Sequence, residues 1–523
     1  MNHFSPDGLY LLFYGLVDSF ILATPIVYFG VLFIISLYGF HKVLMIWRFY
    51  KYRDNYRGHY SETEFGAAQS FATADLPYVT VQLPIFNELY VVERLLDAIA
   101  RLKYPLEKLE IQVLDDSIDE TQLLCQQKIT SLQQKGYNIT YIQRPTRDGF
   151  KAGALDYGLR QASGELVMIF DADFVPMPGT LLQMVDYFVD PAVGMVQARW
   201  SHLNRQYSLL TEIQALMLDG HFVIEQTSRS RSGCFFNFNG TAGVWRTSAI
   251  ADAGGWQHTT VTEDLDLSYR VQLKGWRCLY LPHIVVPAEL PMEMNAFKSQ
   301  QFRWAKGASQ VARKLLGRVF RAKVPFYVKC EAFFHLTNNF NYLLMMVLLL
   351  LSFPYQLYIA YYEWEYEWQY GLLLYFPILG ITTLNLFGFY WVSQREQRSI
   401  ANPLQPGIVS PWQLVYHIFF VLSIGIGMSL NQSLAVCDGF LGTGADFVRT
   451  PKHGVVRKSE KWTNKKYRGA KTWVLCLELM MLVYLAATIA FAIAHGHYSS
   501  LPFLTMFFVG YSYVLALGLF QRR

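Results

Sequence analysis

Two kinds of pattern divide the chain: long apolar runs near both ends, and a central stretch of ordinary polarity between them. The run from Phe20 to Phe40 contains no charged residue and is long enough to cross a hydrocarbon core of about 30 Å. Four later runs also predict membrane-spanning helices: Ala332–Tyr355, Tyr370–Val392, Lys471–His495 and Leu501–Phe520. The pattern therefore predicts a polar domain between an N-terminal membrane anchor and a C-terminal group of membrane helices.

Basic residues indicate which side of a membrane each helix end faces. Five of them follow the first run and place that end in the cytoplasm by the positive-inside rule: Lys42, Arg48, Lys51, Arg53 and Arg57. The N-terminus lacks a basic region and a cleavage site of small residues, so we expect a retained anchor. The run Leu9–Val17 is interfacial or extends this anchor, and a second span there stays open. The run Trp412–Val436 lies between Arg395 and the basic stretch Arg449–Arg468, both expected in the cytoplasm, which favours an interfacial or re-entrant segment.

Between Tyr78 and Lys329 the chain alternates between strand and helix patterns. The expected strands are Val79–Leu83, ended by Pro84, and then Glu110–Leu114, Asn138–Ile142 and Leu166–Phe170. Helices are expected from Glu88 to Leu102 and from about Glu120 and Lys151. This order predicts an α/β domain with a mostly parallel sheet, right-handed crossovers and helices on both faces. No Gly-x-Gly-x-x-Gly follows any of these strands, so a dinucleotide site is not supported.

Acidic residues stand where two of the expected strands end. Asp115 and Asp116 follow the second strand, and Asp171 and Asp173 follow Leu166–Phe170. Ligands of open α/β sheets bind beyond the carboxyl ends of the strands, so both pairs should face one crevice. The alternation of Asp171 and Asp173 points both carboxylates to one side, as a hard divalent cation requires. An Asp-x-Asp motif alone is as often a solvated loop, but two acidic clusters at one edge favour a site.

Two further stretches carry candidate chemistry. Glu263 and Asp264 follow Thr262 at the start of an apolar-periodic helix, where Thr262 is a natural N-cap and Asp264 could serve as a base. Arg303 and Trp304, on a long helical stretch with Gln300, supply a forked donor and a flat apolar face. Such a pair is either a surface ion pair beside a core aromatic, or a binding site for a pyrophosphate and a sugar ring.

Basic residues provide two weaker candidates. Lys151 belongs to a basic, glycine-containing turn before a helix, which is a usable anion site. Thr450 and Lys452 lie in the basic stretch near the C-terminus, which could bind anionic lipids or form a mobile flap over phosphates.

The composition supports membrane placement. Of 523 residues only 16% are charged, against about 25% in soluble domains, and the net charge is +5. The positive residues cluster beside apolar runs, so we expect contact with membrane lipids and no nucleic-acid partner. Six cysteines are scattered without a Cys-x-x-Cys motif, which argues against a zinc site or disulfide framework and indicates a reducing compartment.

In order and spacing, four motifs resemble those of the membrane-integrated family 2 glycosyltransferases, which include cellulose, chitin and hyaluronan synthases. They are Asp115-Asp116-Ser117, Asp171-Ala172-Asp173, Thr262-Glu263-Asp264 and Gln300-x-x-Arg303-Trp304. Three segments are similar in particular to the plant mannan-synthase type of cellulose-synthase-like proteins and its bacterial relatives: Phe238–Arg246, Glu263–Leu267 and Gln300–Trp304. The resemblance covers roughly Pro77 to Gly317.

The resemblance implies an α/β GT-A fold at the cytoplasmic face, Rossmann-like with a mixed, mostly parallel sheet. It also implies a nucleotide-sugar donor of the UDP-glucose or GDP-mannose type. It implies the following site: Asp115, Asp116, Lys151 and Asp171 on the nucleotide sugar; Asp171 and Asp173 on Mg²⁺ or Mn²⁺; Asp264 as the base; Glu263, Gln300, Arg303 and Trp304 around the acceptor and diphosphate. Thr450 and Lys452, in Phe447-x-x-Thr450-x-Lys452, are similar to the gating loop of cellulose synthases, from which the spacing and Pro451 depart. A single base opposite the leaving group implies inversion at the anomeric carbon.

The predicted organisation comprises residues 1–57 as the anchor, 58–329 as the glycosyltransferase domain, 330–446 as transmembrane and interfacial helices, 447–470 as the gating-like loop and 471–523 as a transmembrane hairpin. The leading interpretation is an inner-, plasma- or Golgi-membrane enzyme that extends a β-linked polysaccharide and moves it through its own helices. The alternatives are transfer of one sugar to a membrane lipid, and a transporter or scaffold with a degenerate enzyme domain, which the intact carboxylates argue against. The donor sugar, the linkage, export partner proteins and the oligomeric state stay open.

Overall fold

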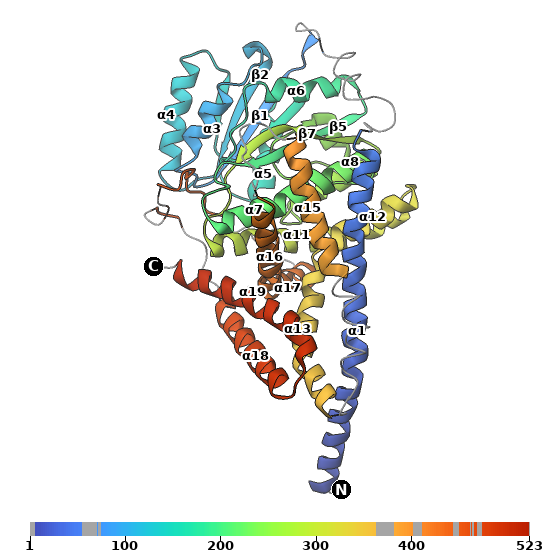
Figure 1. The fold of residues 1–523 in the computed structure, drawn as a ribbon. Helices are drawn as coiled ribbons and strands as arrows, with labels where there is room; N and C mark the ends of the chain where they lie inside the picture. The colour runs from blue at the N-terminus through green and yellow to red at the C-terminus, as the bar shows by residue number, and fades with distance from the viewer. Residues whose placement is uncertain are drawn as a thin grey trace, which may run out of the picture.

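The computed structural model describes residues 6–54, 71, 75–361, 381–400, 410–442, 449–460, 462, 465–467 and 473–521. An α/β domain occupies one end of the molecule and long helices extend from it, with the N-terminus far from the sheet (Figure 1). Several predictions fall partly outside the described residues, among them the first half of the run Tyr370–Val392, Phe447 and Arg57.

The sheet has seven strands in the order β3-β2-β1-β4-β6-β5-β7. Their bounds are β1 Val79–Ile85, β2 Leu109–Asp115, β3 Ile139–Ile142, β4 Leu166–Ile169, β5 Val193–His202, β6 Gly243–Arg246 and β7 Arg277–Ala288. Only β6 runs antiparallel to its neighbours, β4 and β5, and the other pairs are parallel. The prediction of a mixed, mostly parallel sheet is confirmed.

Strand β4 lies near the middle of this sheet and is buried on both faces. Leu166 and Met168 pack into the core on one face, and Val167 and Ile169 into the core on the other. This explains why its sequence is apolar without interruption, since both sets of alternating side chains leave water. The central position of β4 also brings the residues that follow it to the middle of the sheet edge.

The prediction that Pro84 ends the first strand is wrong. β1 continues through Pro84 to Ile85, which pairs with Asp115 of β2. The ladder with β4, on the other side, already ends at the pair of Gln82 with Ile169. Beyond this point β1 is paired on one side only, so a proline without an N–H group is tolerated there.

Helices cover both faces of the sheet and connect it to the rest of the molecule (Figure 1). Those between β1 and β5 are α3 Val92–Ile99, α4 Thr121–Gln133, α5 Phe150–Leu159 and α6 Thr180–Val185. After β5 come α7 Leu209–Asp219, the π-helix η4 Gly220–Gln226, α8 Thr227–Arg231, α9 Thr247–Asp252, α10 Glu263–Leu273 and α11 Met294–Arg321. The helix expected from Glu88 to Leu102 is shorter than predicted, because a turn precedes α3.

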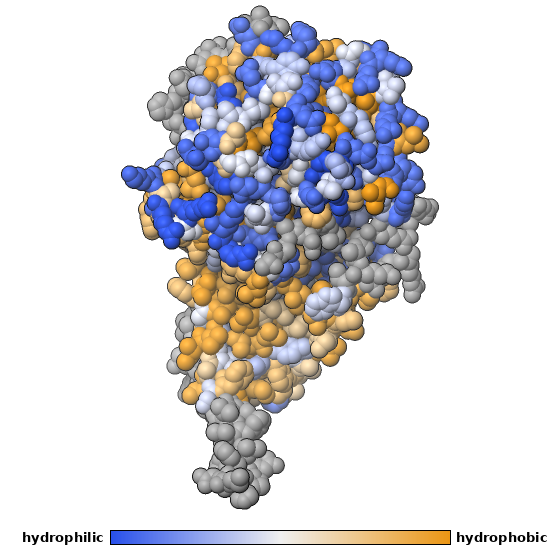
Figure 2. All heavy atoms as spheres, turned by 180° about the vertical axis from the view of Figure 1, so that it is seen from behind, coloured by the Kyte–Doolittle hydropathy of each residue, from blue (hydrophilic) through white to orange (hydrophobic). Residues whose placement is uncertain are grey.

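Among the described residues, four helical segments are long and apolar enough to cross a membrane. They are Asp18–Tyr52 within α1 (Pro6–Tyr52), α13 (Phe340–Tyr361), α18 (Val474–Ala494) and Tyr498–Phe520, which includes α19 (Leu501–Phe520). On the face that Figure 2 shows, apolar residues dominate the surface of this helical part, whereas the α/β domain is largely polar. These helices indicate insertion into a membrane. The Leu9–Val17 run lies within the single helix α1 and extends the anchor.

One predicted membrane run is divided in the structure, and the run predicted to be interfacial or re-entrant is bent. The run Ala332–Tyr355 is divided between α12 (Phe326–Thr337) and α13, because the helix breaks at Asn338 and Asn339. Asn side chains compete for backbone groups, and Asn341 donates to the Asn338 carbonyl from its own side chain at 3.1 Å. The run Trp412–Val436 forms α16 (Pro411–Gly427) and α17 (Ser429–Leu441), which meet at 49° as a broken span or a re-entrant loop.

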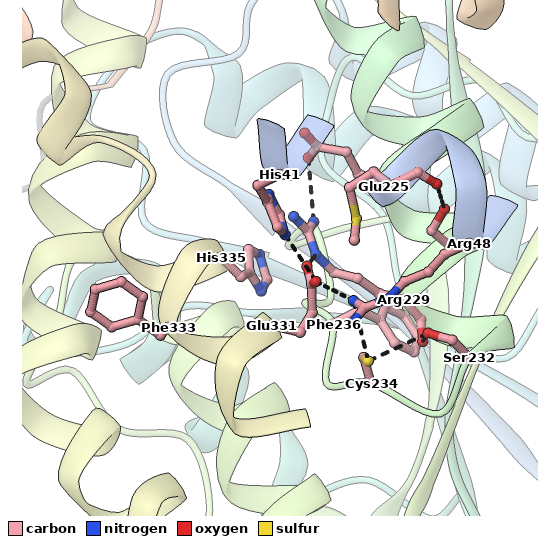
Figure 3. A network of polar contacts seen from close by, with 12 residues as sticks. His41, Arg48, Glu225, Arg229, Ser232, Cys234, Phe236, Glu331, Phe333 and His335 are labelled. Atoms are coloured by element: carbon pink, nitrogen blue, oxygen red, sulfur yellow. Dashed lines mark hydrogen bonds and ion pairs between the residues drawn. The ribbon is translucent and has the colours of Figure 1, made fainter. Parts of the chain in front are cut away.

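A buried cluster of charges joins the anchor helix to the α/β domain (Figure 3). Glu331 of α12 is the centre of it: one oxygen accepts from His41 of α1 at 2.9 Å and also pairs with Arg48, and the other accepts from Arg229 of α8 at 2.9 Å. Burial raises the pKa of the Glu331 carboxyl, but His41 and the two arginines outweigh this and hold the pKa well below its usual range. Glu331 therefore stays ionised and ties three helices together.

We expect Glu331→Gln to destabilise the protein by about 3 kcal/mol, because it removes the central anion and leaves buried cations without compensation. The measurement is thermal unfolding of the purified protein in detergent. Asp156→Asn is the control, since its partner Arg160 is 77% exposed and such pairs contribute less than about 1 kcal/mol. Equal shifts of the two variants would show that the cluster does not hold the junction.

Candidate functional site

The carboxyl ends of the parallel strands open into one cavity with about 1440 Å³ of empty space, part of it open to solvent. It is lined by the ends of β1, β2, β4 and β7, by the beginning of α10, by α11 and by residues 449–453. The structure brings these predicted site residues together there: Asp116, Lys151, Asp171, Asp173, Glu263, Asp264, Gln300, Arg303, Trp304, Thr450 and Lys452. Six segments that are separate in sequence therefore share one crevice.

Asp115 does not line this cavity with the others. It is fully buried, accepts from the backbone N–H of Ser117 at 2.8 Å and receives a hydrogen bond from the Tyr141 hydroxyl at 3.1 Å. Burial raises the pKa of its carboxyl, and these hydrogen bonds oppose the rise. Asp115 shapes the turn after β2, and its neighbour Asp116 faces the cavity.

The Asp171 and Asp173 carboxylates each form an ion pair with a lysine. Lys151 of α5 lies 2.5 Å from Asp171, and Lys452 pairs with Asp173. Burial raises the pKa of Asp171, but the two lysines outweigh it, so its pKa lies below the usual value. The Asp171 backbone N–H also donates to Thr241 at 2.9 Å, which fixes the turn beyond β4. The Asp171 carboxylate therefore stays ionised inside a largely buried site.

These two carboxylates fit a divalent cation of the magnesium type. Their oxygens are hard ligands, and Mg²⁺ is held in proteins by one or two carboxylates together with the phosphates of a substrate. In the part of the chain that the structure describes, no group of three or more His, Cys, Asp or Glu residues could hold a metal alone. A cation at Asp171 and Asp173 would therefore need oxygens of a bound substrate to complete its coordination shell.

Asp264 lines the same cavity, in the first turn of α10. Its carboxylate accepts from the Leu265 N–H at 2.8 Å. Burial, followed by the neighbouring carboxylate of Glu263, raises the pKa of Asp264 to about 7. A carboxyl group with a pKa near neutrality is suited to accept a proton during catalysis.

Gly240 lies beside both Lys151 and Asp264. Its carbonyl accepts from Lys151 at 2.9 Å, and a Cβ atom at this position would stand 3.0 Å from an Asp264 oxygen. The φ angle of +83° is one that glycine adopts without strain. The Lys151–Asp171 pair and Asp264 therefore lie close together, on either side of Gly240.

Thr262 occupies the N-cap position of α10, as predicted, but its side chain makes no capping hydrogen bond. The helix α11 presses against it: a Cβ atom on Gly307 would lie 2.3 Å from the Thr262 methyl group. Only glycine permits this approach, which sets Arg303 and Trp304 against the start of α10. Burial lowers the pKa of Arg303, while Glu263 and Asp171 oppose this.

The basic segment 449–454, from the C-terminal part of the chain, lies along one side of the cavity. Arg449 forms a forked contact with Glu88 at 2.7 and 3.2 Å, and the Gly454 N–H donates to Glu289 at 3.0 Å. Together with the Lys452–Asp173 pair, these contacts dock the segment on the ends of β1, β4 and β7. The predicted flap therefore lies against the acidic site.

Three lining residues were not identified from the sequence. Glu289 immediately follows β7, so the rule that pointed to Asp171 could have found it. Glu88 follows β1, but its partner Arg449 is 361 positions away. Asn239 lies in Phe238–Arg246, a segment that carries the family resemblance, but it was assigned no role there. His221 and Gln226 of η4 hold its side chain at 3.1 and 2.7 Å.

Comparison with known proteins adds a family and relatives. Residues 77–307 match the model of the family described as glycosyltransferase like family 2. Probable glucomannan 4-beta-mannosyltransferase 9 of Oryza sativa subsp. japonica is 35% identical over 463 residues, which cover 85% of this chain and 82% of the relative. Probable glucomannan 4-beta-mannosyltransferase 7 of the same plant is 45% identical over 263 residues, 49% of this chain and 45% of the relative. The matched part of the chain thus spans about half the length of the latter.

Among solved structures, the mannosyltransferase from Pyrobaculum calidifontis in complex with GDP-Man and Mn²⁺ is 20% identical to this chain. The match covers 73% of this chain and 99% of that chain, with a TM-score of 0.48.

We expect Gly307→Ala to destabilise the protein by about 1–3 kcal/mol, because the added methyl group overlaps Thr262 in a closely packed contact. Gly317→Ala, in the same helix α11, is the matched control: its Cβ atom would meet nothing within 4 Å. Alanine is the better helix former by up to about 1 kcal/mol, so this variant should be stabilised. Thermal unfolding of both variants checks the opposite signs, and a neutral Gly307→Ala would contradict the packing argument.

Proposed function

Because the chain belongs to the family 2 glycosyltransferases, whose fold is GT-A, we propose that it transfers a sugar from a nucleotide-sugar donor to a growing β-linked polysaccharide. The observation that carries this proposal is that Gly240 lies beside both the Lys151–Asp171 pair and the base candidate Asp264. The Lys151–Asp171 pair supplies charges that suit a diphosphate and its cation. Asp264 supplies a carboxylate that could accept the proton of an acceptor hydroxyl. The relatives' names as glucomannan mannosyltransferases favour a GDP-mannose type of donor.

The diphosphate of the donor would lie between Asp171 and Asp173 on one side and the cations of the cavity on the other. Lys151, Arg303 and Lys452 all line this space. A divalent cation, Mg²⁺ or Mn²⁺, held by Asp171 and Asp173 would neutralise the charge that develops on the leaving diphosphate. Arg303 presents a fork of N–H donors suited to phosphate oxygens.

Asp264 would remove the proton from the acceptor hydroxyl as that oxygen attacks the anomeric carbon. With the diphosphate at Asp171 and Asp173 and the acceptor at Asp264, the sugar would lie between them, and attack and departure would occur on opposite faces of it. An α-linked donor therefore gives a β-linked product. Trp304 of α11 offers its flat face to a sugar ring of the acceptor.

The proposed location is a membrane with the α/β domain in the cytoplasm, in the inner or plasma membrane or a Golgi-type membrane. Basic residues at the domain end of α1 support this orientation by the positive-inside rule. A growing glycan would leave through the helices beneath the site.

The test is incubation of the purified protein with radiolabelled GDP-mannose, UDP-glucose and other donors, followed by sizing of the products. Long chains that a β-glycosidase digests would support the polysaccharide synthase. A single sugar on an organic-extractable lipid would contradict it and favour a lipid glycosyltransferase.

Asp264→Asn should lower the transfer rate by at least about 100-fold, because an amide cannot accept the acceptor's proton. Binding of the free nucleoside diphosphate should change little, since Asp264 lies on the acceptor side. Asp252→Asn, at an exposed ion pair with Lys274, is the control for the same chemical change. Transfer at the normal rate in Asp264→Asn would show that another group is the base.

The transfer rate should rise with pH through about pH 7. The pKa of Asp264 is raised to about 7, so its basic, deprotonated form is scarce below that pH and dominant above it. A plot of log kcat/KM against pH should rise with a slope near 1 at acidic pH and level off above about pH 8. A flat profile across this range, or one that falls, would contradict proton removal by Asp264.

A further inference from the structure

The end of the cavity formed by β1, β2 and β3 carries groups that the proposed chemistry does not use. Phe86 follows β1, Asp116 follows β2, and Arg147 lies in the loop between β3 and α5; all three line the cavity. Asp171 and Asp173 follow β4, on the other side of β1. A donor whose diphosphate lies at Asp171 therefore has this end of the cavity available for its nucleobase.

Arg147 lies flat on an aromatic ring. Its guanidinium carbon is 3.3 Å from the centre of the Phe86 ring and 5.0 Å from that of Phe150. At 3.3 Å an edge-on approach is excluded, so the guanidinium is parallel to the Phe86 ring and its N–H groups point sideways. Among the described residues Arg147 makes no ion pair, and its Nε is buried without a hydrogen-bond partner.

The backbone around this pair is held in an uncommon conformation. Gly149 and Phe150 both have positive φ angles, +69° and +49°, and so does Asn87, next to Phe86, at +53°. For residues other than glycine this costs free energy, and such residues concentrate at functional sites. Asn87 is held on both sides, since its N–H donates to Ser117 at 2.7 Å and its side chain accepts from Ile118 at 3.0 Å. The positions of Phe86 and Arg147 are therefore fixed in advance.

The other polar groups at this end of the cavity are already engaged. Both Asp116 oxygens accept from Arg144, one of them at 3.0 Å from its Nε. Arg144 also donates to two backbone carbonyls, those of Asp148 and Phe150. The guanidinium N–H groups of Arg147 are therefore available to a ligand at this end of the cavity.

We propose that Arg147 reads the base of the donor and selects guanine. Guanine presents two acceptors side by side, O6 and N7, which match the two parallel N–H groups of an arginine fork. Uracil offers no such adjacent pair of acceptors, and a fork makes at most one good hydrogen bond to it. The inference rests on the proposed function, because it assumes that the donor's diphosphate lies at Asp171 and Asp173.

The first experiment measures binding of GDP and of UDP to the full-length protein in detergent with Mg²⁺ or Mn²⁺. A bidentate contact discriminates bases by roughly 5- to 150-fold, so Arg147→Met should weaken GDP binding by about that factor and change UDP binding less than about threefold. Arg147→Lys, which keeps the charge but not the fork, should lose most of the same preference. Arg160→Lys, in the exposed ion pair of α5, is the matched control and should alter neither affinity.

A second experiment needs no variant that might fold poorly. 7-Deaza-GDP lacks the N7 acceptor and should bind to the unmodified protein roughly tenfold more weakly than GDP, as expected for one hydrogen bond to a charged group. In Arg147→Met, GDP and 7-deaza-GDP should bind alike. Equal binding of the two nucleotides by the unmodified protein would overturn the proposal.

The outcomes separate this inference from the proposed function. If Arg147→Met weakens GDP and UDP equally, Arg147 is a phosphate ligand and the reading of the base is wrong, while the transferase stands. If the unmodified protein shows no preference for GDP over UDP, the guanine donor itself is wrong, and Arg147 selects no base.

Discussion

The structure depends on the balance of charge inside one largely buried crevice. Asp171 and Asp173 lie largely out of contact with water, at the end of a strand that is covered on both faces. The negative charge of each is compensated by a lysine from a different part of the chain. Lys151 comes from the helix after β3, and Lys452 from the segment that precedes the last two helices. A carboxylate buried without such a partner would cost several kcal/mol. In the proposed complex the two carboxylates would bind a divalent cation and the two lysines would bind the diphosphate. Donor binding would therefore replace the ion pairs that stabilise the crevice.

Close backbone contacts keep the two sides of the crevice at a fixed distance. Gly307 lets α11 touch Thr262 at the start of α10, and Gly439 of α17 approaches the Lys306 carbonyl of the same helix α11. Helix α11 is therefore held between the edge of the sheet that lines the cavity and the helices of the proposed membrane region. The buried cluster around Glu331 makes a second connection, from α12 to the anchor helix. A glycan that leaves the site would pass between elements that these contacts hold in place.

The sequence was sufficient to predict the mixed sheet, the family and the crevice, because each depends on local patterns. An apolar run that ends in Asp171 and Asp173 marks a central strand, and four ordered motifs carry the resemblance that the family match confirms. The sequence could not show that Asp116 and not Asp115 faces the cavity, since adjacent side chains alternate and the direction depends on the whole sheet. It also could not pair Glu88 with Arg449 across the chain. The strand end at Pro84 was predicted wrongly, because it depends on where the neighbour β4 stops.

The central claim is a single displacement in which Asp264 and the diphosphate lie on opposite faces of the transferred sugar. The most direct test is the anomeric configuration of the first bond formed, read by NMR from a short product made with an α-linked nucleotide sugar. The account predicts a β-linkage. An α-linked product would contradict it, because retention requires two displacements, or departure and attack on the same face.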